Sequence, residues 1–176
     1  TVQPGMFYRD FEKITLEKGL ILPCYTASKS LNAMGGMFGN NSAGERTLKY
    51  GKTEDYILQT KVVFSDGIER IVKPISLNEI NKQGEIYAKV YDLIKNNTEY
   101  IQRAKPNVHK NSAGYYIWNV LFSPDMQNLT ALPASGLRHG LDFAYSAPKI
   151  FDLNKLLVGS QGTLGIATEI TFKVIP

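Results

Sequence analysis

Two glycine-rich segments contain the residues of this chain that are best suited to holding a ligand. The first runs from Gly35 to Gly44, and the second runs from Gly159 to Gly165, directly before a strand-like run at 166–172. Glycine permits backbone shapes that other residues avoid, and it lets main-chain N–H groups approach a phosphate or a planar ring closely. The pair of segments therefore predicts a site for a nucleotide-type cofactor.

Neither segment has the spacing of the common nucleotide-binding motifs. No G-x-G-x-x-G follows a strand, and G-x-x-x-x-G-K-[ST] does not occur. A single glycine cluster is more often a turn, so the prediction depends on the two segments acting together. These spacings disfavour a Rossmann domain and a P-loop.

Length and composition are those of an ordinary globular domain. The chain has 176 residues, of which 43% are hydrophobic and 20% are charged, enough for one core or for two small subdomains. It contains no run of about 18 apolar residues, so no transmembrane segment is expected. The net charge of +4 comes from scattered Lys and Arg residues, which favours a mixed-charge surface over nucleic-acid binding.

Cysteine and histidine are scarce. Cys24 is the single cysteine, which excludes an internal disulfide and is typical of a cytoplasmic protein. His109 and His139 lie next to basic residues, without the spacing of a metal site. No Ser-His-Asp set and no pair of carboxylates at catalytic spacing is evident. We therefore expect neither a metal nor a catalytic residue within this chain.

Hydrophobic periodicity and turn residues predict an alternation of short helices and strands. The hairpin is the clearest of these elements, because Asp66-Gly67 is a typical reversing turn. The expected elements are a helix over 7–18 that ends near Gly19, a buried strand over 20–22, a hairpin of 56–64 and 68–72, helices over 84–96 and 99–104, a long loop with one short helix over 123–151, a helical turn over 153–157 and a strand over 166–174.

Four motifs follow one another in a recognisable order. They are Val2–Gly5, Gly35–Gly51, Lys110–Tyr115 and Gly159–Glu169. Together they resemble the FAD-linked oxidases of the vanillyl-alcohol oxidase and p-cresol methylhydroxylase superfamily, particularly the branch with the flavin subunits of glycolate oxidase and D-lactate dehydrogenase. The resemblance implies an α+β fold with a mainly antiparallel sheet flanked by helices, the second subdomain of a PCMH-type FAD-binding domain.

The resemblance also implies which residues hold the cofactor, FAD. In the family the first glycine segment wraps the flavin and pyrophosphate portion, and the second lies along the cofactor. The residues expected to contact FAD are Pro23, Ser28, Gly35, Gly36, Asn40, Asn41, Ser42, Ala43, Gly44, Tyr50, Gly51, Gly162, Thr163, Gly165 and Ile166.

Charged and aromatic residues near these motifs leave alternatives open. Arg46 and Lys49 could pair with a phosphate or a substrate carboxylate, or could be solvated loop residues. Lys110 and Tyr115 could approach the flavin, or could serve packing alone.

The chain also departs from the family pattern. Gln161 stands where relatives commonly have glutamate. The upstream pyrophosphate loop and the C-terminal substrate cap have no counterpart, so residues 1–176 are expected to be a partial FAD-binding domain with little activity alone.

The resemblance implies a flavin-dependent oxidoreductase. Its substrate would be a small 2-hydroxy acid such as glycolate or D-lactate, oxidised by hydride transfer to FAD. Electrons would pass to a quinone, a cytochrome or an iron–sulfur partner, in the cytoplasm or at the membrane periphery. The alternative is a non-catalytic interaction or scaffold domain that has lost the cofactor.

Overall fold

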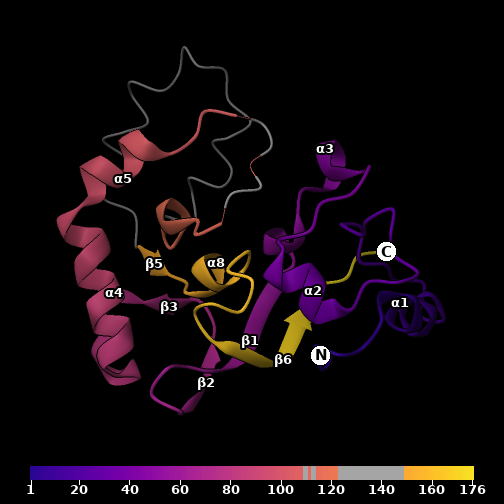
Figure 1. Ribbon diagram of the computed structural model, residues 1–176, viewed down its shortest axis with the longest axis horizontal. Coiled ribbons are helices and arrows are strands. Elements are labelled where there is room, and N and C mark those ends of the chain that lie inside the picture. Colours follow the sequence, from indigo (N-terminus) through magenta and orange to yellow (C-terminus); the bar gives the residue numbers. More distant parts are fainter. Residues whose placement is uncertain (109–110, 112–113, 123–148) are drawn as a thin grey trace. The chain divides into compact units, whose positions relative to one another are not determined.

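The computed structural model describes residues 1–108, 111, 114–122 and 149–176. These residues form two compact units (Figure 1). The first unit combines Thr1–Lys73, Pro106–Tyr116 and Leu153–Pro176, and the second combines Pro74–Lys105 and Ile117–Asp152.

The first unit is built on a three-stranded antiparallel sheet in the order β2-β1-β6. The strands are β1 (Ile57–Val63), β2 (Glu69–Val72) and β6 (Ile166–Phe172). The hairpin expected from the Asp66-Gly67 turn is confirmed, since Thr60 pairs with Val72 in β2. On its other edge Thr60 pairs with Ile170, and Ile170 also forms a bridge to Val2.

Short helices complete this unit. They are α1 (Tyr8–Leu16), α2 (Met34–Gly39), α3 (Thr47–Tyr50), the 3-10 helix η1 (Thr53–Asp55) and α8 (Asn154–Leu157). α1 buries Tyr8 and Phe11, and the ring of Phe11 lies 6.2 Å from that of Phe172 in β6. The left-handed backbone of Gly19, with φ of +68°, follows α1 as expected.

One expectation for this unit is wrong: the strand expected over 20–22 is reduced to a single bridge between Ile21 and Ile175. No element was expected over the start of the first glycine segment, where residues 34–39 form α2. Met34 and Met37 are fully buried, and this burial outweighs the cost of about 1 kcal/mol that each glycine imposes on a helix.

The second unit has a small antiparallel sheet in the order β3-β5-β4. Its elements are β3 (Ile75–Ser76), the 3-10 helix η2 (Leu77–Gln83), α4 (Glu85–Asn96), α5 (Thr98–Ala104), the 3-10 helix η3 (Ile117–Asn119), β4 (Leu121–Phe122) and β5 (Ile150–Phe151). Tyr87 and Tyr91 of α4 pack on Phe151 with ring centroids 6.0 and 6.1 Å away. The two helices expected in this part are confirmed, and the loop expected over 123–151 lies mostly outside the described residues.

The observed mixture of helices and antiparallel strands confirms the α+β class. Among the described residues, none of the helices combines the length and the apolar character needed to cross a bilayer. His109, Lys110 and His139 lie outside this part of the chain. In the part that is described, no three His, Cys, Asp or Glu side chains gather in a way that could hold a metal ion.

Candidate functional site

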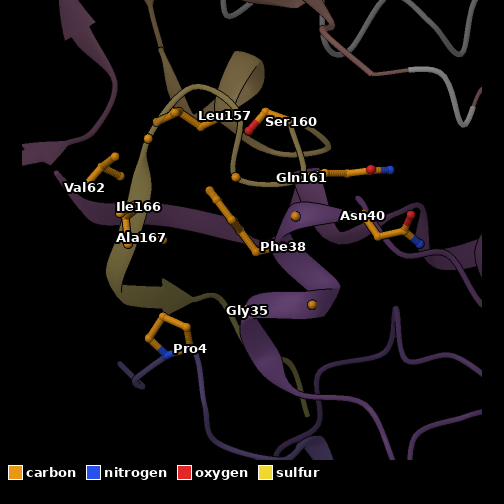
Figure 2. Close-up of a pocket in the computed structure, with 14 residues that line it drawn as sticks. Pro4, Gly35, Phe38, Asn40, Val62, Leu157, Ser160, Gln161, Ile166 and Ala167 are labelled. Carbon is orange, nitrogen blue, oxygen red and sulfur yellow. The ribbon is translucent and has the colours of Figure 1, made fainter. Parts of the chain in front are cut away.

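A cavity of about 450 Å³ lies in the first unit, where the two glycine segments meet (Figure 2). Its size falls within the range of about 300–1,000 Å³ that is usual for small-molecule sites. Its lining residues are Pro4, Gly35, Gly36, Phe38, Gly39, Asn40, Val62, Leu157, Ser160, Gln161, Gly162, Gly165, Ile166 and Ala167.

Backbone hydrogen bonds fix the two glycine segments against each other. The N–H of Gln161 donates to the carbonyl of Gly39 over 2.9 Å, and the N–H of Gly159 donates to the carbonyl of Phe38 over 3.0 Å. At the other end of α2, the N–H of Gly35 donates to the carbonyl of Pro4 over 2.8 Å. These bonds hold α2 between the N-terminal segment and the second glycine segment. Backbone contacts therefore fix the relative positions of the cavity walls.

The cavity wall is uncharged. None of its lining residues is Asp, Glu, Lys, Arg or His, and its polar side chains are those of Asn40, Ser160 and Gln161. Figure 2 shows Phe38 pointing from α2 toward the side of the cavity where Val62, Ile166 and Ala167 lie. An apolar wall with a few amides, hydroxyls and open backbone suits a flat, uncharged ring better than it suits a phosphate.

Packing within the chain explains some of the glycines in the cavity wall but not all of them. A Cβ on Gly35 would lie 2.6 Å from Cβ of Pro4, and a Cβ on Gly165 would lie 2.6 Å from Cγ1 of Val62. These two glycines are required by packing within the chain. A Cβ on Gly36 would have no atom of the chain within 4 Å, and φ at Gly36 is not positive. Neither packing nor backbone shape explains why residue 36 is glycine.

The structure brings some of the predicted contact residues to the cavity and leaves the others away from it. Those in the cavity wall are Gly35, Gly36, Asn40, Gly162, Gly165 and Ile166. Those that do not line it are Pro23, Ser28, Asn41, Ser42, Ala43, Gly44, Tyr50, Gly51 and Thr163. Cofactor contact remains a prediction for both groups.

Several residues of the second group have structural roles. The side-chain oxygen of Asn41 accepts from the N–H of Glu54 over 3.0 Å. Gly44 lies so close to the carbonyl of Tyr25 that a Cβ would overlap it. Gly51 has φ of +74° and follows α3 directly. Residues 41–51, which include α3, therefore pack against the loop near Tyr25 and against η1.

Some lining residues were not predicted. Pro4, Phe38, Gly39, Ser160, Gln161 and Ala167 all belong to motifs that are visible in the sequence, although none of them was predicted to contact the cofactor. Val62 and Leu157 give no local signal, because they reach the cavity through the pairing of β1 with β6 and through α8.

The charged residues near the first glycine segment do not line the cavity. The guanidinium of Arg46 lies 5.2 Å from the ring centroid of Tyr25, and the ammonium of Lys49 lies 4.9 Å from that of Tyr50. Arg46 and Lys49 are exposed. Cys24, by contrast, is buried, and this burial raises the pKa of its thiol to about 12. These positions favour solvated loop residues at 46 and 49 and a packing role for Cys24.

An uncharged cavity between two glycine segments defines a candidate site for a ring-bearing cofactor. Residues 1–72 match the family described as "FAD binding domain". This match confirms the resemblance drawn from the motifs, and it indicates FAD as the cofactor.

The chain is also similar to individual proteins. The chain is 28% identical over 176 residues to the glycolate oxidase subunit GlcD of Bacillus subtilis (strain 168), covering 100% of this chain and 23% of the relative. It is 29% identical over 150 residues to a D-2-hydroxyglutarate dehydrogenase of Pantoea ananatis (strain AJ13355), covering 81% of this chain and 12% of the relative. Among solved structures, an alkyldihydroxyacetonephosphate synthase matches 99% of this chain and 20% of its own, with 18% identity and a TM-score of 0.49. The chain thus spans less than a quarter of the length of these proteins.

Proposed function

We propose that this chain is part of the FAD-binding domain of a flavin-dependent oxidoreductase that acts on small 2-hydroxy acids. The match of residues 1–72 to FAD binding domains supports the cofactor. The names of the relatives, glycolate oxidase subunit and D-2-hydroxyglutarate dehydrogenase, support the substrate class. Glycolate and D-lactate remain the substrates that the motifs favour.

The observation that carries the proposal is the open space in front of Gly36. An alanine at an interior helical position is worth about 0.5–1 kcal/mol more than a glycine. The chain nevertheless has glycine at position 36, although no atom of the chain comes within 4 Å of the place a Cβ would take. Because Gly36 lines the cavity, the missing side chain leaves room for a ligand.

The proposed cofactor site is a cradle of backbone and small side chains. Gly36 of α2, Asn40 directly after this helix, Gly162 and Ile166 all line the cavity. Gly35 and Gly165 allow close packing against Pro4 and Val62. The uncharged wall would hold a ring of FAD and exclude water from it. FAD supplies the redox chemistry by accepting two electrons and hydrogen from the substrate.

Other parts of the proposed enzyme are assigned to the full-length protein. Residues 1–176 would be a partial FAD-binding domain, with the pyrophosphate loop and the substrate cap contributed elsewhere. The enzyme residue that takes the hydroxyl proton of the substrate would also lie outside this chain. The same holds for the electron acceptor, whether it is a quinone, a cytochrome or an iron–sulfur protein. We place the protein in the cytoplasm, in keeping with its single cysteine, or at the membrane periphery.

Titration of the full-length protein with FAD tests the proposal. We expect a yellow protein with bound flavin, and we expect Gly36→Val to weaken FAD binding strongly because its side chain enters the cavity. Gly5→Val is the matched control, since it also adds a side chain into open space but at a residue that does not line the cavity. Cys24→Ser is a second control and should leave FAD binding nearly unchanged.

Two results would contradict the proposal. Equal losses of FAD binding in Gly36→Val and Gly5→Val would remove the assignment of the cavity. A full-length protein that retains no flavin after saturation with FAD and removal of the free FAD would favour an interaction or scaffold domain instead.

A further inference from the structure

We propose that Tyr115 is a positioning residue for the cofactor cavity. Its hydroxyl holds Thr163, and through Thr163 it holds the turn that carries Ser160, Gln161 and Gly162 in the cavity wall. The inference rests on the proposed function only in naming FAD as the occupant of the cavity.

The hydrogen bonds of Thr163 fix the direction of this link. The hydroxyl of Thr163 donates to the carbonyl of Ser160 over 2.6 Å. It also lies 2.7 Å from the hydroxyl of Tyr115. A threonine hydroxyl has one proton to donate, so Tyr115 is the donor to Thr163. Ser160 lines the cavity, and the chain of bonds therefore runs from Tyr115 to the cavity wall.

Tyr115 belongs to a short segment that is itself held in place. We call Gly114–Tyr116 the strap. A Cβ on Gly114 would lie 2.5 Å from the carbonyl oxygen of Gly159, so the strap passes directly over the second glycine segment. The ammonium of Lys52 donates to the hydroxyl of Tyr116 over 3.2 Å and lies 4.4 Å from the centroid of its ring. The strap is thus attached on the side of the first glycine segment as well.

The backbone on both sides of the link is in a rare conformation. Tyr115 has φ of +44° and Gln161 has φ of +54°, in the left-handed region that costs free energy for residues with a side chain. Such conformations persist only where the surroundings hold them. Without the Tyr115 hydroxyl, the turn at 159–163 would gain access to other shapes, and a smaller fraction of the protein would have the wall ready for the ligand.

Because Tyr115 is partly exposed, its role in positioning the cavity wall can be distinguished from a role in the stability of the fold. Tyr115 is 45% exposed, whereas its neighbour Tyr116 is only 2% exposed. Removing one exposed hydroxyl should leave the urea midpoint of unfolding nearly unchanged. Its effect should appear instead in the cavity wall and in ligand affinity.

The test compares Tyr115→Phe, Thr163→Val and the double variant in the full-length protein. We expect Tyr115→Phe to weaken FAD binding about threefold to tenfold, as expected for one lost hydrogen bond. The double variant should bind no more weakly than Thr163→Val, because both changes break the same link. Thr163→Ser keeps the hydroxyl and should lose less FAD affinity than Thr163→Val does. Tyr100→Phe removes an exposed hydroxyl from the other unit and serves as the matched control.

Hydrogen exchange, measured on the protein without FAD, tests the role of Tyr115 independently of the proposed function. We expect the backbone amides of residues 159–165 to exchange faster in Tyr115→Phe and in Thr163→Val, with a smaller change in Thr163→Ser and none in Tyr100→Phe. Unchanged exchange in Tyr115→Phe, or fully additive losses of FAD affinity, would overturn the inference. An absence of FAD binding in the unmodified protein would overturn the proposed function, and the exchange measurement would still decide the role of Tyr115.

Discussion

Gly35 packs against Pro4 so closely that a methyl group on it would lie 2.6 Å from Cβ of that proline and 3.0 Å from its carbonyl oxygen. The next residue of α2, Gly36, has open space at the same place. Two adjacent glycines therefore serve different purposes, one within the fold and one at its surface.

Alanine at these two positions should have opposite effects on stability. We expect Gly35→Ala to lower the free energy of unfolding by about 1–3 kcal/mol, because the contact with Pro4 becomes overpacked. We expect Gly36→Ala to raise it by up to about 1 kcal/mol while weakening FAD binding roughly tenfold. Urea unfolding and flavin titration of the same samples would measure both effects. A Gly36→Ala variant with unchanged FAD affinity would contradict the assignment.

Asn154 should be a major contributor to the stability of the first unit. Its side-chain oxygen accepts from the hydroxyl of Thr60 in β1 over 2.7 Å, and its amide donates to the carbonyl of Val72 in β2 over 3.1 Å. All of this is buried, so Asn154→Ala leaves polar groups without partners and should cost about 3 kcal/mol. Thr60→Val should cost less, and the double variant should cost less than the sum.

The exposed Asn96 at the end of α4 provides the control for that experiment. Asn96→Ala should change the free energy of unfolding by less than about 0.5 kcal/mol. Strictly additive effects of Asn154→Ala and Thr60→Val in urea unfolding would show that the two side chains do not act together.

Cys24 should make the protein sensitive to alkali. Its thiol is 1% exposed, and burial raises its pKa from the usual 9.0 to about 12. The folded state therefore binds the proton more tightly than the unfolded state does. The protonated thiol therefore contributes to the free energy of unfolding. This contribution is fully present below pH 9 and is lost as the pH rises toward 12, at about 1.4 kcal/mol per pH unit.

Urea midpoints between pH 8 and pH 11, compared with those of Cys24→Ala, would measure this loss. The difference between the two proteins should shrink as the pH rises. In the folded protein at pH 8 the thiol should also react slowly with an alkylating reagent, and denaturant should speed the reaction. Rapid labelling of the folded protein would show that Cys24 is not shielded as described.

Lys52 and Glu54 form an ion pair in which neither side chain is freely solvated. The ammonium lies 3.0 Å from the carboxylate, and the side chains are 16% and 8% exposed. Burial opposes the charge on Lys52, but the charge of Glu54 outweighs that effect, and the pKa of Lys52 is raised. Lys52→Met should therefore cost about 3–5 kcal/mol, because it leaves a buried carboxylate without its cation.

A second pair provides the comparison for this experiment. The ammonium of Lys89 lies 2.7 Å from the carboxylate of Glu85 in α4, but these side chains are 74% and 78% exposed. Lys89→Met should therefore leave the urea midpoint nearly unchanged. The double variant Lys52→Met/Glu54→Leu should recover part of the loss. Equal effects of Lys52→Met and Lys89→Met on the urea midpoint would refute the distinction.

Local sequence signals predicted the elements that depend on local chemistry. The hairpin was readable because Asp66 accepts from the N–H of Ile68 and Gly67 adopts φ of +76°. The spacing of apolar residues in α4 gave a similar signal. Helix α2 was not readable, because its sequence Met-Gly-Gly-Met-Phe-Gly is unfavourable for a helix and is folded by contacts from distant parts of the chain.

The same distinction holds for the candidate site. Gly36 and Gly162 were predicted from the glycine segments, and both line the cavity. The turn at 41–44 belongs to the same segment but packs within the chain, which the spacing of glycines cannot reveal. Val62 and Leu157 enter the wall only once β1, β6 and α8 have assembled.

The pairing of β1 with β6 has a consequence for how the molecule is made. Ile57 is paired with Phe172 and Val63 with Ile166, partners that are separated by most of the chain. Closing so long a loop is entropically costly and slows folding. During synthesis β1 therefore keeps one edge unpaired until β6 has left the ribosome, and over that interval it is exposed to aggregation.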